Sequence, residues 1–225
     1  MPATVLAREI PWLEPAWAFA ALARLAAPVW LDSALPGPRQ GRWSYVAADP
    51  FLLLRSKDGR ITADERMFTG DPFATLARLL QRFPLAHDPA LPPFQTGAIG
   101  WLGYDLCHHL ERLPAPESDD LRFPDLMLGL YDTILAFDLQ EQRAWLLSSG
   151  FPETAPEAQM ARRRARSEQF LWLVERAVPL PEPATTAAEI AIRSNFTRTA
   201  YEAAVQRTID YILAGDIFQA NISQR

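Results

Sequence analysis

The sequence predicts an α+β fold in which helices pack on antiparallel sheets. Two observations carry this prediction: the strand-like segments come in pairs joined by short turns, and no strand–helix–strand crossover is needed to connect them. Asp58-Gly59 is a strong hairpin turn between two apolar segments, and Asp138-Leu139-Gln140 connects a second pair. With 49% apolar residues in a chain of 225, one large core or two small ones can form.

The first half of the chain is expected to contain two helices and five strands. Glu14-Pro15 predicts the start of a helix, because proline is tolerated in a first helical turn, and Pro28 breaks that helix after about Ala27. Asp71-Pro72 predicts a second helix that runs to about Phe83. The expected strands cover residues 29–31, 42–48, 51–56, 61–63 and 96–103, and a short helical turn covers residues 104–110.

The second half is expected to contain a hairpin, a long helix, a linker and the start of another domain. Residues 126–137 and 143–148 predict the hairpin, and residues 156–177 predict a charged helix. Residues 179–193 are rich in Pro, Ala and Thr, so they predict a linker between domains at residues 1–178 and 194–225.

The last segment predicts a helix followed by a strand. Thr197 or Thr199 can cap the helix, and Gly215 can end it. Residues 216–225 then read as a strand, which needs partners that the preceding helix does not offer. We therefore expect this segment to be the truncated start of a larger domain.

Composition argues against several classes of partner. The formal net charge of −5 gives no reason to expect nucleic acid. No run approaches about 18 apolar residues, so we expect no membrane span. The single cysteine, Cys107, fits a reducing cytoplasm. Lysine occurs once, at Lys57 in an expected exposed turn, which argues against a mechanism with a lysine nucleophile.

Four groups of residues that could carry chemistry are better explained without it. Cys107-His108-His109 are adjacent on an expected helical turn, so they point about 100° apart and do not converge on one metal ion. The glycines at 97, 100 and 103 lack the Gly-Lys-Ser/Thr of a phosphate loop and predict close packing of another backbone or a large side chain. Arg162-Arg163-Arg164 predicts a solvated helix face of mixed charge, and Asp119 and Asp120 predict a solvated loop.

Several segments taken together resemble one enzyme family. Ser194–Thr197, Ala214–Gln219 and Asn221–Arg225 closely resemble the opening of the chorismate-utilising domain shared by anthranilate synthase component I and aminodeoxychorismate synthase component I. Upstream segments resemble the family's N-terminal region in the family's order: Trp30–Ser33, Gly41–Tyr45, Gly97–Leu106, Phe123–Asp125 and Gly129–Asp132. The resemblance implies the N-terminal region of the anthranilate synthase component I fold, followed by the first helix and strand of the chorismate-binding domain.

Within the family, Asn221 before Ile222-Ser223-Gln224-Arg225 looks more like the aminodeoxychorismate branch, since anthranilate synthases more often carry a second valine in that strand. Leu31-Asp32-Ser33 departs from the Leu-Glu-Ser of tryptophan-inhibited anthranilate synthases. In the aminodeoxychorismate branch the matching pocket can hold tryptophan as a structural ligand. By that match Ser33 would contact its amino group, with Arg42 and Trp43 nearby.

The resemblance implies replacement of the chorismate 4-hydroxyl by an amino group, with Mg²⁺ holding the carboxylates and ammonia supplied by a separate glutamine amidotransferase subunit. It places the catalytic and metal-binding residues beyond the position of Arg225, so this chain alone is expected to hold no catalytic residue, metal or cofactor and to be inactive. Two alternatives remain open: anthranilate synthase component I, and a non-catalytic module that binds tryptophan or docks an amidotransferase.

Overall fold

The computed structural model describes residues 3–35, 37, 40–114, 119–179, 191 and 193–224. The chain divides into two compact units, residues 1–181 and 182–225, and each is treated separately here. Most of the expected linker at 179–193 lies outside the described residues, so the domain bounds stay a prediction.

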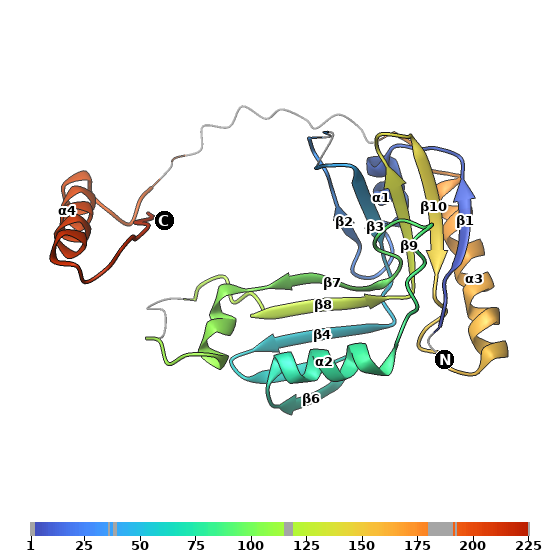
Figure 1. The fold of residues 1–225 in the computed structure, drawn as a ribbon, viewed down its shortest axis with the longest axis horizontal. Helices are drawn as coiled ribbons and strands as arrows, with labels where there is room; N and C mark the ends of the chain where they lie inside the picture. Colours follow the sequence, from blue (N-terminus) through green and yellow to red (C-terminus); the bar gives the residue numbers. More distant parts are fainter. Residues whose placement is uncertain are drawn as a thin grey trace. The chain divides into compact units, whose positions relative to one another are not determined.

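The first unit contains two five-stranded sheets in which all neighbouring strands are antiparallel (Figure 1), which confirms the predicted fold class. Sheet I has the order β1-β10-β9-β3-β2, with β1 at Leu6–Ile10, β2 at Val29–Leu31, β3 at Trp43–Ala47, β9 at Thr133–Asp138 and β10 at Arg143–Ser148. Sheet II has the order β6-β5-β4-β8-β7, with β4 at Leu52–Lys57, β5 at Arg60–Ala63, β6 at Arg66–Thr69, β7 at Gly97–Leu102 and β8 at Leu126–Tyr131.

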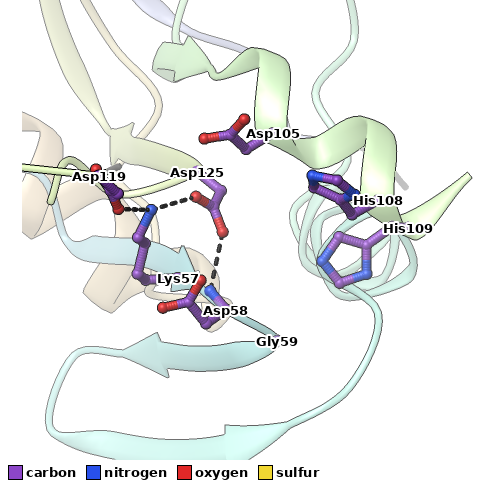
Figure 2. Close-up of a pocket in the computed structure, with 8 residues that line it drawn as sticks. All are labelled: Lys57, Asp58, Gly59, Asp105, His108, His109, Asp119 and Asp125. Carbon is purple, nitrogen blue, oxygen red and sulfur yellow. Dashed lines mark hydrogen bonds and ion pairs between the residues drawn. The ribbon is translucent and has the colours of Figure 1, made fainter. Parts of the chain in front are cut away.

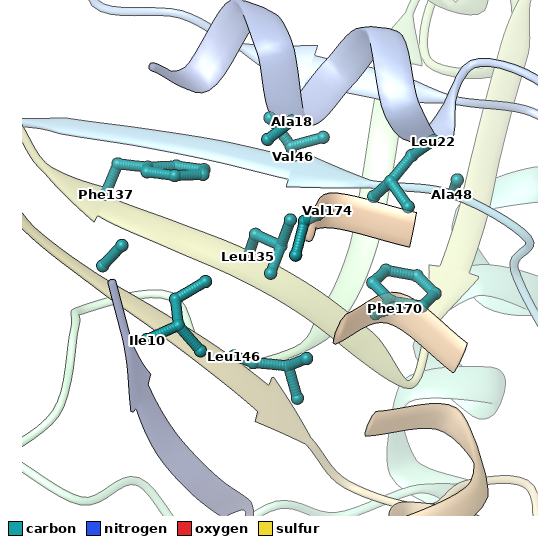
Figure 3. Packing of buried hydrophobic residues seen from close by; sticks show 11 residues of the cluster. Ile10, Ala18, Leu22, Val46, Ala48, Leu135, Phe137, Leu146, Phe170 and Val174 are labelled. Atoms are coloured by element: carbon teal, nitrogen blue, oxygen red, sulfur yellow. The ribbon is translucent and has the colours of Figure 1, made fainter. Parts of the chain in front are cut away.

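Helices α1 (Pro15–Leu22) and α3 (Pro156–Val174) pack on one face of sheet I. Figure 3 shows the apolar side chains between these layers, which come from α1, α3 and alternate positions of β3, β9 and β10. Alternation follows from the strand period of two, which sends every second side chain to the helix side. The residues at the centre of this core are Ala18, Leu22, Val46, Leu135, Phe137, Leu146 and Phe170.

Helix α2 (Pro72–Arg82) covers sheet II, where Phe73, Leu76 and Leu79 pack on the buried strand residues. The Asp71 side chain accepts a hydrogen bond from the Phe73 amide at 2.8 Å, so the predicted helix start is confirmed with its cap. A short 3₁₀ helix, η1 (Tyr104–His109), follows β7 as expected.

Several details of the predicted elements were wrong. Helix α1 ends at Leu22 rather than Ala27, and Ala27 itself has a positive φ of 42°. Strands β1 and β6 were not predicted, and β6 is an edge strand with all four residues exposed. Residues 126–137 are not one strand: the chain leaves β8 of sheet II, passes Asp132, and enters β9 of sheet I. Only β9 and β10 form the predicted hairpin.

The second unit contains α4 (Arg198–Ala214). The Thr197 hydroxyl accepts a hydrogen bond from the Ala200 amide at 3.2 Å, and Gly215 ends the helix with a φ of 84°, both as predicted. The predicted strand after it is not formed: residues 216–224 contain no strand, and Phe218 is 94% exposed. A strand requires a partner for its backbone groups, and this segment pairs with none in the described part of the chain.

Among the helices of the described residues, none combines the length and the apolar character needed to cross a membrane.

Candidate functional site

The structure brings the three predicted tryptophan-site residues together at one corner of sheet I, where β2 turns toward β3. Ser33 lies two residues after β2, Arg42 immediately precedes β3, and Trp43 is the first residue of β3. The Ser33 hydroxyl donates a hydrogen bond to the Trp43 carbonyl oxygen at 2.7 Å. A direct hydrogen bond therefore holds Ser33 next to Trp43. The role of the three residues in binding stays a prediction.

Two further residues complete this corner. The Ser44 hydroxyl, which is fully buried, accepts a hydrogen bond from the Ser33 amide at 3.1 Å and donates one to Asp32 Oδ1 at 3.2 Å. Ser44 was part of the resembling segment, but nothing in the sequence indicated that it joins Ser33 to Asp32. We call Asp32, Ser33, Arg42, Trp43 and Ser44 the corner site.

Arg42 is held in place by a buried carboxylate that is distant in the sequence, that of Asp138. Its Nε donates to Asp138 Oδ2 at 3.0 Å, and Asp138 is only 1% exposed. Burial raises the pKa of Asp138, but hydrogen bonds from Arg42 and from the Glu141 and Gln140 amides outweigh it, so the net pKa is lowered. Asp138 therefore stays ionised and fixes the guanidinium 5.1 Å from the centre of the Trp43 ring.

Aromatic side chains follow one another from the corner along sheet I, where Trp145 is buried in the core. The Trp43 and Trp145 rings lie 6.0 Å apart, and the Arg143 guanidinium lies 4.8 Å from the centre of the Trp145 ring. Arg143 is itself paired with Glu9 at 2.8 Å. Indole rings flanked by guanidinium groups suit an aromatic ligand, and the Ser33 hydroxyl offers lone pairs to an ammonium group.

A cavity of about 450 Å³ lies at one end of sheet II (Figure 2). Lys57 lies in it between Asp119 and Asp125, with Nζ–Oδ distances of 2.6 and 3.0 Å. Figure 2 also shows Asp105, His108 and His109 on η1 beside this ion-paired group.

The environment of Lys57 differs from the expected exposed turn. It is the last residue of β4, and its hydrogen bonds to Asp119 and then to Asp125 raise the pKa of its amine above the ordinary value. The expectation that Asp119 is merely solvated was also wrong, since its carboxylate holds Lys57. A lysine that remains protonated in this way is a poor nucleophile. Within the described residues, no group of three His, Cys, Asp or Glu side chains gathers in a way that could hold a metal ion.

The expectation of a solvated arginine face was wrong for Arg162 and Arg163, while Arg164 is exposed as expected. Arg162 Nε donates to the fully buried Asp132 at 2.7 Å, and Arg163 Nε donates to the Ser149 carbonyl oxygen at 2.9 Å. Arg166 pairs with Asp49 at 2.6 Å and lies 3.5 Å from Asp132. Burial raises the pKa of Asp132, against the opposing effect of Arg166 and Arg162. These contacts join α3 to the crossing between the sheets.

The prediction of close packing at the glycines is confirmed at two positions. A Cβ atom on Gly100 would lie 1.9 Å from the Met127 carbonyl oxygen of the neighbouring strand, and one on Gly103 would lie 2.9 Å from the Asp125 carbonyl oxygen. These glycines therefore allow the backbone of the β7 segment to lie close to the backbone at β8.

Comparison with known proteins gives the family. Residues 33–225 match the family model described as chorismate binding enzyme, which is most of the chain. The chain belongs to the chorismate binding enzyme family. It is 36% identical over 216 residues to an anthranilate synthase component 1 from Thermus thermophilus, covering 94% of this chain and 44% of that protein. It is 30% identical over 201 residues to an aminodeoxychorismate synthase component 1 from Bacillus subtilis, covering 85% of this chain and 41% of that protein.

A solved structure supports the fold of this family member. The crystal structure of anthranilate synthase component I from Streptococcus pneumoniae superimposes with a TM-score of 0.60 at 21% identity, over 81% of this chain and 42% of that one. The chain thus spans less than half the length of the relatives that it matches.

Proposed function

We propose that this chain is the N-terminal part of an aminodeoxychorismate synthase component I, an enzyme of 4-aminobenzoate and folate biosynthesis in the cytoplasm. The observation that carries the choice of branch is Asn221 before Ile222-Ser223-Gln224-Arg225, where the anthranilate branch more often has a second valine. The similarity to the aminodeoxychorismate synthase component 1 of Bacillus subtilis supports it. Asp32, in place of the glutamate of tryptophan-inhibited anthranilate synthases, supports it as well.

In the proposed reaction, the nitrogen of ammonia forms a bond to C4 of chorismate, and the 4-hydroxyl group leaves. A separate glutamine amidotransferase component would supply the ammonia, and Mg²⁺ would bind the chorismate carboxylates in the whole enzyme. The described residues of this chain gather no metal-binding group, and their one lysine is ion-paired at the end of β4. We therefore assign no step of the chemistry to this chain, whose part is to build the two sheets and the corner site.

The complete reading frame should convert chorismate and ammonia, with Mg²⁺ at high pH, into 4-amino-4-deoxychorismate. Mass spectrometry distinguishes this product from anthranilate by mass. The 225-residue chain, assayed in parallel, should give neither product. Anthranilate from the complete protein would establish the runner-up, which the Thermus thermophilus relative favours. Turnover by the 225-residue chain would show that catalytic residues lie within it.

For the corner site, we propose L-tryptophan as a bound structural ligand whose amino group contacts Ser33, beside Arg42 and Trp43. The support is geometric: the Ser33 hydroxyl gives its proton to the Trp43 carbonyl, so its lone pairs are left for an ammonium group. Calorimetric titration of L-tryptophan into the chain should show binding that Ser33→Ala weakens about tenfold, the loss expected for a hydrogen bond to a charged group. Equal affinity in the variant would argue against Ser33 as the contact.

A further inference from the structure

We propose that Ser44 is a positioning residue of the corner site, which sets the orientation of Ser33 toward the amino group of the ligand. The proposal rests on the tryptophan site proposed above. The hydroxyl group of Ser44 forms hydrogen bonds with the Ser33 amide and with the Asp32 carboxylate.

The direction of each hydrogen bond at the corner is determined by which groups can donate. Asp32 is a carboxylate acceptor, so the Ser44 hydroxyl must give it the proton over 3.2 Å. The lone pairs of Ser44 are then left to accept the Ser33 amide at 3.1 Å. Ser33 in turn gives its own hydroxyl proton to the Trp43 carbonyl at 2.7 Å. The chain of bonds therefore leaves Ser33 as an acceptor, which is what an ammonium group requires.

Ser44 acts on Ser33 from the opposite face of the sheet. In the β3–β9 register Ser44 is opposite Phe137, which belongs to the core beneath the helices. Trp43 and Tyr45, its neighbours in β3, pack with the residues of the other face. One carboxylate oxygen of Asp32 is engaged by Ser44. The fully buried Ser44 thus adds side-chain bonds just beyond the end of β2 to the backbone pairing of β2 with β3 and to the Ser33–Trp43 bond.

The test compares two ligands that differ in the amino group. L-Tryptophan and indole-3-propionate are titrated by calorimetry into the wild-type chain and into Ser44→Ala. We expect Ser44→Ala to weaken L-tryptophan about tenfold and to leave indole-3-propionate unchanged, because only the amino group depends on the orientation of Ser33. Ser44→Thr, which retains a hydroxyl, should restore the affinity for L-tryptophan to within about threefold of wild type.

A matched control and a second variant distinguish a loss of ligand affinity from a loss of folded protein. Ser56→Ala removes a buried serine hydroxyl from β4 of sheet II, where it bonds to no described residue, and should bind both ligands as wild type does. Asp32→Ala removes the acceptor of Ser44 at an exposed position and should weaken L-tryptophan alone, by about threefold.

Each result decides a different point. Equal weakening of both ligands would mean a general structural effect and would overturn the positioning role, as would unchanged affinities in Ser44→Ala and Asp32→Ala. Absence of L-tryptophan binding to the wild-type chain would overturn the tryptophan site itself, and the role of Ser44 with it.

Discussion

Replacement of Asp132 by alanine is expected to lower the free energy of unfolding by about 3–5 kcal/mol, the range for breaking a buried ion pair by removing one partner. Asp132 is fully buried, with Arg162 at 2.7 Å and Arg166 at 3.5 Å. The pair itself is not the source of this loss, since burial disfavours the charged carboxylate. The loss arises because the nearly buried guanidinium of Arg166 loses one of the two described carboxylates that offset its charge and keeps only Asp49.

Urea denaturation of the chain, followed by circular dichroism, measures this change. Asp132→Asn retains the size and an acceptor oxygen, so it should lie between wild type and the alanine variant. Glu9→Ala is the matched control, because Glu9 forms a pair with Arg143 on sheet I in which both side chains are about half exposed. It should alter stability far less, since solvent screens such a pair. An Asp132→Ala protein as stable as the control would contradict the assigned role of the buried pair.

Replacement of Gly100 by alanine is expected to destabilise the chain by about 3 kcal/mol or more, the upper range for inserting an atom into packed structure. The added Cβ would lie 1.9 Å from the Met127 carbonyl oxygen and 2.9 Å from the Leu128 Cα. Both atoms belong to the backbone of β8, so no side-chain rotation relieves the overlap. Strand β7 would have to separate from β8, with loss of ladder hydrogen bonds.

Gly70→Ala provides the control for Gly100→Ala. The nearest atom to its added Cβ is Ile61 Cδ1 at 3.9 Å, an ordinary contact distance. We expect this variant to remain within about 0.5 kcal/mol of wild type in the same denaturation experiment. If the stability of Gly100→Ala also stayed close to that of wild type, β7 would have to pair with β8 at a wider separation than the structure shows.

The sequence predicted the parts of the fold that depend on local chemistry. The helix starts at Asp71 and Thr197 and the helix end at Gly215 follow from side-chain caps and a left-handed glycine, which act over a few residues. The crossing at Asp132 could not be found in this way, because residues 126–137 are apolar nearly throughout and contain no proline. Which sheet each half joins depends on partners far away in the chain.

At the corner site, too, the sequence indicated some of the residues but not their distant partners. The resemblance brought Ser33, Arg42 and Trp43 to attention, but the carboxylate that fixes Arg42 comes from Asp138, 96 positions further along the sequence. The hydrogen bonds of Arg162 and Arg163 likewise depend on Asp132 and Ser149, which no pattern within α3 indicates. The strand expected after Gly215 was not formed, because a strand cannot be specified without its neighbour.

The strand order has a consequence for how the chain assembles during synthesis. All five strands of sheet II come from residues 52–131, whereas sheet I joins strands from residues 6–47 to strands from residues 133–148. Sheet II can thus close while translation continues, but the middle of sheet I must wait for β9. Until then β3 has an open edge, a state prone to aggregation. Closing such a long loop is slow, so we expect the completion of sheet I to limit the folding rate.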